Sequence, residues 1–190
     1  MRRTRLRWLA LALAALLILP GCIVRSVHSW LRDDSITFEE DLLGGWTGAD
    51  DKGGVVAMTF VRGVDNNYIV QYADKDSHGI FEGRLGKFGT DYYMDFKPKE
   101  AAQGVDGMLL FPTHTVARLE ISPSALVLRA LDYEAVKAAT KLDRLRDVQY
   151  AWEENELLIT SSSSDLQRFL LGLSRDSNLY APPIKLARRK

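Results

Sequence analysis

Hydrophobic and polar residues alternate along much of the chain beyond residue 40, and this period of two constrains the fold more than any other feature. Successive side chains of a β-strand point to opposite faces of its sheet, so the alternation is typical of strands with one buried face. The clearest examples are residues 56–60, 68–72, 92–96 and 117–121. Further strands fit residues 80–87, 125–131, 148–152 and 157–160. The pattern therefore predicts about eight short strands.

Residues that favour turns separate these predicted strands. They include Gly53, Gly79, Gly89 and Pro123, each beside polar neighbours. Because the connections are mostly short, consecutive strands should pair as an antiparallel meander. A meander of this length curls into a barrel or a strongly curved sheet, which removes exposed edges. We therefore expect a mainly β fold.

Two short helices interrupt the alternation. Residues 133–146 are rich in Ala, Lys and Leu and form the first. In the second, Ser164 and Gln167 have the spacing of a capping box, and apolar residues then recur at helical intervals. These residues are Leu166, Phe169, Leu170 and Leu173. We expect this helix to pack its apolar face against the sheet.

The first 21 residues have the composition of a secretory signal peptide. Residues 1–7 contain four arginines and no acidic residue, and the twelve residues 8–19 are all apolar. A membrane-spanning helix needs roughly 20 apolar residues, whereas Pro20 and Gly21 interrupt this run after twelve. We therefore predict a cleaved signal peptide. The alternative is an uncleaved anchor that continues through Ile23 and Val24.

The apolar run leads into Leu19-Pro20-Gly21-Cys22, which resembles the lipobox of bacterial lipoproteins. In that motif an aliphatic, a variable and a small residue precede an invariant cysteine. The resemblance implies cleavage between Gly21 and Cys22 and lipidation of Cys22, so that acyl chains hold the protein in the cell envelope. Ile23, in place of an aspartate after the cysteine, implies the outer membrane with the domain facing the periplasm.

The predicted organisation is a signal peptide at 1–21, the lipidated cysteine with a tether at 22–37, a single β-rich domain at 38–180 and a loose tail at 181–190. Without the four leader arginines, 21 basic and 25 acidic residues leave a net charge of −4. Because nucleic-acid binding relies on Lys and Arg to neutralise phosphates, this balance argues against DNA or RNA as a partner. The expected partners are the membrane, through the lipid on Cys22, and an apolar small molecule or another envelope protein.

Gly44-Gly45-Trp46 stands at the start of the first expected strand and resembles the Gly-x-Trp signature of the lipocalin superfamily. In that family the tryptophan plugs the closed end of an eight-stranded barrel, so the resemblance implies the same place for Trp46. The body of the chain is also similar to uncharacterised bacterial lipoproteins with a lipocalin-like β-barrel. That second resemblance implies no activity.

Bulky side chains occupy the predicted inward rows of the sheet. An eight-stranded barrel is just wide enough either to be filled by side chains or to hold one ligand. If it holds a ligand, we expect an apolar or amphipathic small molecule. The residues predicted to contact it are Trp46, Phe60, Tyr72, Tyr92 and Phe96. The alternative is a structural protein with a filled core.

No motif indicates a particular reaction. The chain has no HExxH zinc motif, nucleophile elbow or glycine-rich phosphate loop. Residues 74–79 place oxygen ligands at alternate positions but lack the later acidic ligand of a calcium loop. We therefore predict no cofactor, metal site or catalytic residue. The enzymatic alternative is an envelope hydrolase that uses His114 with an acid such as Asp132.

Overall fold

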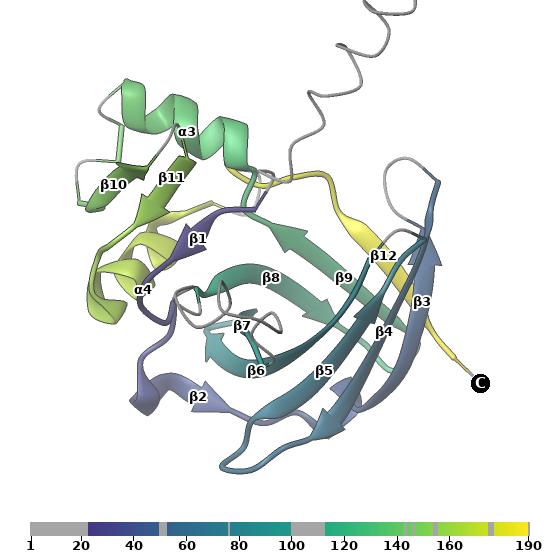
Figure 1. Cartoon of the computed structure of the whole chain (residues 1–190). Helices are drawn as coiled ribbons and strands as arrows, with labels where there is room; N and C mark the ends of the chain where they lie inside the picture. Colours follow the sequence, from purple (N-terminus) through teal and green to yellow (C-terminus); the bar gives the residue numbers. More distant parts are fainter. Residues whose placement is uncertain are drawn as a thin grey trace, which may run out of the picture.

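Eight antiparallel strands form a closed barrel in the computed structural model (Figure 1). The structure describes residues 23–49, 53–75, 77–99, 113–142, 144–145, 147–153, 156–174 and 177–189. The barrel strands are β3 (Gly44–Ala49), β4 (Val55–Arg62), β5 (Tyr68–Ala73), β6 (His78–Phe88), β7 (Asp91–Pro98), β8 (Thr115–Ile121), β9 (Ala125–Ala130) and β12 (Ile184–Arg188). Strands β3 to β9 pair in chain order, which confirms the predicted meander and its closure.

The last strand closes the barrel. β12 pairs with β9 on one side and with β3 on the other, where Arg188 lies opposite Trp46. Residues 181–190 were predicted to be a loose tail, and the structure differs there. Residues 184–188 of this segment form β12. The sequence did not indicate a strand, because only Ile184 and Leu186 alternate as inward apolar residues and the residues after them are mostly charged.

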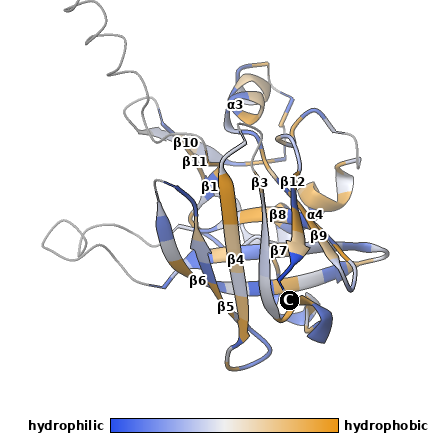
Figure 2. Ribbon diagram, turned by 90° about the vertical axis from the view of Figure 1, so that its right-hand side faces the viewer, coloured by the Kyte–Doolittle hydropathy of each residue, from blue (hydrophilic) through white to orange (hydrophobic). Residues whose placement is uncertain are grey.

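A second layer is formed mostly by the chain between β9 and β12, and β1 (Arg25–Ser26) from the N-terminal segment joins it. It contains α3 (Tyr133–Lys141), α4 (Ser163–Gly172) and a separate three-stranded sheet of β1, β11 (Glu156–Ile159) and β10 (Tyr150–Glu153). The predicted strands at 148–152 and 157–160 thus form β10 and β11, outside the barrel. Figures 1 and 2 both show α3 standing beyond the end of the barrel at which β9 finishes.

The segment predicted to be a tether is part of the folded body. Val24, Trp30 and Leu31 are at most 2% exposed and belong to the hydrophobic cluster of the second layer. Three further short elements follow: η2 (Asp33–Ser35), β2 (Ile36–Thr37), which pairs with β6, and η3 (Glu40–Leu42). The sequence of this segment lacks a regular period because it crosses from one layer to the other.

Two hydrophobic clusters share the wall formed by β7 and β8. One fills the barrel, whereas the other packs α3, α4 and β11 against the outer face of that wall through Tyr93 and Val116. Both faces of β7 are therefore buried around residues 93–96. This arrangement leaves the ends of the barrel as the places where its interior meets solvent.

Candidate functional site

One end of the barrel is closed by Trp46. Its side chain is fully buried, and its indole Nε1 donates to the carbonyl oxygen of Leu42 at 2.9 Å. The Arg188 guanidinium lies 4.2 Å from the centre of the Trp46 ring and donates to the carbonyl oxygens of Asp41 and Leu43. Trp46 is therefore a buried residue held between Arg188 and the backbone of residues 41–43.

Residues 38–43 cross this closed end as a strap. The Tyr68 hydroxyl accepts a hydrogen bond from the Glu39 backbone N–H at 2.7 Å and donates to the Glu39 carbonyl oxygen at 3.1 Å. The Phe38 ring stacks on Tyr68 with centroids 4.6 Å apart, and burial raises the pKa of Tyr68 to about 12. The Tyr92 hydroxyl donates to the Glu39 carboxylate at 2.6 Å. These hydroxyls thus have protein partners.

The barrel is tightly filled from this end to its middle. Seven inward or capping side chains are 0% exposed: Leu42, Trp46, Tyr68, Val70, Leu85, Met94 and Leu126. A Cβ added at Gly83 would lie 2.9 Å from both the Met94 sulfur and a Val70 methyl carbon. Because real Cβ atoms do not approach other heavy atoms so closely, this part of the interior has no room for a ligand.

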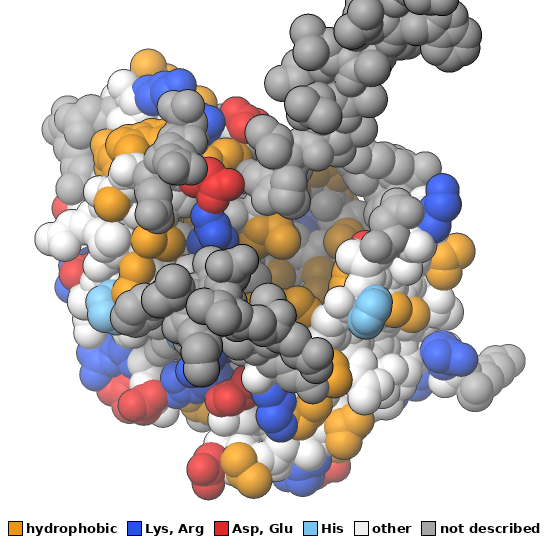
Figure 3. Space-filling model, viewed as in Figure 1, with side chains coloured by type: hydrophobic (Ala, Val, Ile, Leu, Met, Phe, Trp, Pro, Cys, Tyr) orange, Lys and Arg blue, Asp and Glu red, His pale blue; other side chains and the backbone are white. Residues whose placement is uncertain are grey.

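Most inward side chains nearer the other end keep some exposure. Met58 is 7%, Phe96 8%, Ala117 6% and Leu128 6% exposed, and Tyr72, Phe81 and Ile184 are half-buried. Ala130 lies opposite Ala117 in the β8–β9 pair and so shares its inward face, yet it is exposed. Figure 3 shows the face hollowed here, with hydrophobic side chains inside the hollow. We call these eight residues the open-end cup.

The five predicted ligand contacts do not lie together. Trp46 and Phe60 belong to the packed closed half, and Tyr92 is tied to the strap. Tyr72 and Phe96 belong to the open-end cup. Met58, Phe81, Ala117, Leu128, Ala130 and Ile184 complete the cup. The alternation placed most of these six in strands but could not show which end of the barrel each strand approaches.

His114 has a buried carboxylate partner. Its Nδ1 lies 2.8 Å from Oδ2 of Asp95, which is 0% exposed on the outer face of β7. Asp132, the acid suggested by the sequence, instead caps α3 by accepting a hydrogen bond from the Ala135 N–H at 2.7 Å. The acid beside His114 is therefore Asp95.

A carboxylate that orients an imidazole is one part of a general-base arrangement. The Ser29 hydroxyl donates toward this pair: its Oγ lies 3.0 Å from the carboxylate of Asp95 and 3.0 Å from the carbonyl oxygen of Leu31. Among the hydrogen bonds of the described residues, no serine or threonine hydroxyl bonds the imidazole of His114. The geometry is that of a structural tie between the N-terminal segment and the barrel wall.

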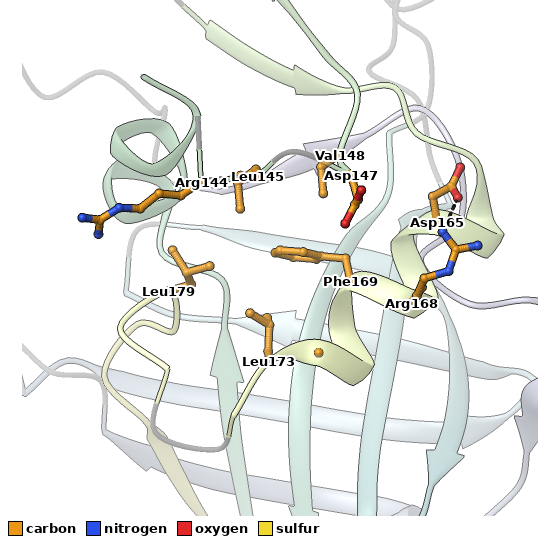
Figure 4. Close-up of a pocket in the computed structure, with 10 residues that line it drawn as sticks. Arg144, Leu145, Asp147, Val148, Asp165, Arg168, Phe169, Leu173 and Leu179 are labelled. Carbon is orange, nitrogen blue, oxygen red and sulfur yellow. Dashed lines mark hydrogen bonds and ion pairs between the residues drawn. The ribbon is translucent and has the colours of Figure 1, made fainter. Parts of the chain in front are cut away.

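A separate cavity of about 280 Å³ lies beside α4 (Figure 4). Phe169 lies in its middle, with Leu173 and Leu179 near the ring. Asp165 and Arg168 at its edge form an ion pair at 2.9 Å. Hydrogen bonds from Ser162 and Arg168 lower the pKa of Asp165. The cavity is at the small end of the range for ligand sites, and its edge charges are paired with each other.

The described residues hold no group of three or more His, Cys, Asp or Glu side chains suited to binding a metal ion. Over the same ranges, no helix is both long and apolar enough to span a bilayer. Cys22 lies outside the described residues. Comparisons with known proteins found that no family model, no curated protein and no solved structure matches this chain.

Proposed function

We propose that this chain is a lipid-anchored protein of the cell envelope whose barrel binds an apolar or amphipathic small molecule in the open-end cup. The observation that carries the ligand proposal is the hollow at the open end of the barrel, where the inward side chains of Phe81, Phe96 and Ala130 keep some exposure. Exposed apolar surface inside a concavity favours an apolar ligand, because its burial removes that surface from water.

The cup also changes from an apolar wall to a polar rim, which matches the two parts of an amphipathic molecule. Phe81 and Phe96 pack edge to face with centroids 6.3 Å apart, and they offer an apolar wall. The Tyr72 hydroxyl donates to the Asp74 carboxylate at 2.6 Å, and so places polar atoms at the rim. An apolar group would contact the aromatic wall, and a polar head group would remain near Tyr72 and solvent.

The anchoring part of the proposal is supported by the sequence. Four arginines, twelve apolar residues and Leu19-Pro20-Gly21-Cys22 follow one another in the order of a lipoprotein signal. Lipid on Cys22 would hold the barrel beside the membrane.

Ligand binding is tested with an environment-sensitive apolar dye and the soluble domain that begins at Ile23. We expect saturable fluorescence enhancement. Ala130→Trp should weaken dye binding about tenfold or more, since loss of roughly 1.4 kcal/mol corresponds to a factor of ten. Ala73→Trp is the matched control, because Ala73 is exposed at the same end but points outward from the barrel. No saturable response, or equal effects of both variants, would favour a structural protein with a filled core.

Anchoring is tested by Cys22→Ser in the full chain. The variant should leave the membrane fraction and appear in the soluble extract, because the thioether-linked acyl chains are lost. Immunoblots of the separated fractions measure this. Continued sedimentation with membranes would show that Cys22 does not hold the protein there.

A further inference from the structure

An exposed aromatic pair lies on β10. Tyr150 is 37% and Trp152 43% exposed, and their rings pack edge to face with centroids 6.3 Å apart. They share one side of the strand, because they are two residues apart. Trp30 and Trp46 are at most 1% exposed, so Trp152 is the one exposed tryptophan of the part that the structure describes.

Helix α3 borders this pair and adds positive charge and further apolar surface. The Lys137 ammonium lies 5.8 Å from the centre of the Trp152 ring, and Leu142, at the C-terminal cap of α3, is 61% exposed. Figure 3 shows hydrophobic side chains gathered over β10 and α3 beside Lys and Arg side chains. We name Lys137, Leu142, Tyr150 and Trp152 the aromatic face.

The described chain starts beside this layer. Ile23, which is 58% exposed, forms a bridge with Asp132, the N-terminal cap residue of α3. In β1, Arg25 pairs with Leu158 of β11, and Leu158 pairs in turn with Ala151 of β10. Two strand spacings, together roughly 10 Å, therefore separate Arg25 from Ala151, which lies between Tyr150 and Trp152 on β10.

The predicted lipid attachment site is close in sequence to this layer. The Cα atom of Cys22 lies about 3.8 Å from that of Ile23, because consecutive residues are joined by a trans peptide. A lipid on Cys22 thus enters the membrane close to the start of α3. The layer of α3 and β10 is then the part of the molecule nearest to the bilayer.

We propose that the aromatic face lies in the head-group region of the membrane that holds Cys22. This inference rests on the anchoring part of the proposed function. Trp and Tyr have an apolar ring with a polar tip, and Lys has an apolar stem with a charged end, so all three are suited to the boundary between head groups and acyl chains. The lipid and the aromatic face together fix the orientation of the barrel on the membrane.

The test uses the lipidated protein purified from membranes and reconstituted into phosphatidylcholine vesicles with brominated acyl chains, which quench tryptophan at close range. We expect the bromolipid to quench the emission of Trp152, measured as the difference between the wild-type protein and Trp152→Phe. Emission from the buried Trp30 and Trp46 should be unchanged. Aqueous iodide should also quench Trp152 less in the vesicle-bound protein than in the soluble domain measured without detergent.

A second reporter supplies the control. Val64, in the turn between β4 and β5, is 76% exposed and lies at the closed end of the barrel. Val64→Trp in the Trp152→Phe background should escape quenching by the bromolipid and remain open to iodide. A Trp152 that bromolipid does not quench, on protein whose mass shows the lipid, overturns the orientation and leaves the anchor intact. A mass without lipid overturns both.

Discussion

At the scale of single residues, Asp95 holds the N-terminal segment against the barrel. Its buried carboxylate accepts a hydrogen bond from the Trp30 backbone N–H at 3.2 Å and lies within 3.0 Å of His114 and Ser29 side-chain atoms. A buried carboxylate is costly unless several donors satisfy it, and these three donors come from two separate segments. These hydrogen bonds of Asp95 therefore depend on the packing of the second layer against β7.

Asp95→Ala should destabilise the domain by about 3 kcal/mol, because three donors lose their acceptor in a buried site. Asp33→Ala is the matched control. Asp33 pairs with Arg84 but its side chain is 95% exposed, so its loss should cost about 0.5 kcal/mol or less. Urea unfolding followed by Trp fluorescence measures both. Similar small losses would mean that Asp95 does not hold the two segments together.

The sequence could suggest His114 as a chemical residue but could not find its partner. Asp95 stands between Met94 and Phe96 in an alternating strand, where a polar residue indicates a solvent-facing position. The second layer covers that position, because the β7–β8 register places His114 beside it and the N-terminal segment, bridged to His114 at Ser26, brings Ser29 to it. An alternating pattern shows which face of a strand points inward; it does not show what covers the other face.

At the scale of elements, α4 joins the second layer to the barrel wall. Its Leu166 and Leu170 are 0% exposed, and the Tyr93 hydroxyl of β7 donates to the Leu170 carbonyl oxygen at 3.4 Å. The predicted apolar face of this helix is therefore the buried one. The helix begins earlier than the predicted capping box, because Ser162 caps it by accepting from the Asp165 N–H.

The shifted start has a physical reason. Four consecutive serines, Ser161 to Ser164, span the start of the helix, and each is of a residue type able to cap it. The side chain of Gln167, expected to close the capping box, instead accepts from the Arg32 backbone N–H at 3.0 Å and from the Ser35 hydroxyl at 3.1 Å. Because Gln167 makes this tertiary contact, it does not form the capping box with Ser164. The local sequence therefore could not predict which serine caps the helix.

Leu170→Ala should destabilise the domain by about 2–5 kcal/mol, because it removes a fully buried side chain and leaves a cavity. Leu171→Ala makes the same chemical change at the next position, where the side chain is 56% exposed, and should cost less than about 1 kcal/mol. Thermal unfolding followed by circular dichroism compares them. Equal losses would show that α4 is not packed as the structure has it.

At the scale of the whole molecule, the alternation predicted the closed β architecture because apolar residues alternate with other residues within each barrel strand and so show which face is buried. It could not assign β10 and β11 to a separate sheet, since a short hairpin has the same local pattern in either place. Nor could it locate the open-end cup. The position of a side chain along the barrel axis depends on the register between paired strands. The sequence does not show that register, including the pairing of β12 with β3 and β9.

The pairing of β3 with β12 also determines when folding can finish. Trp46 meets Arg188 near the far end of the chain, so the entropy of closing a very long loop must be overcome before the ring forms. Until β12 is in place, β3 and β9 each have an unpaired edge and the barrel is an open sheet. Closure of the barrel is therefore the last pairing that this topology allows, after the seven strands of the meander and the second layer have been made.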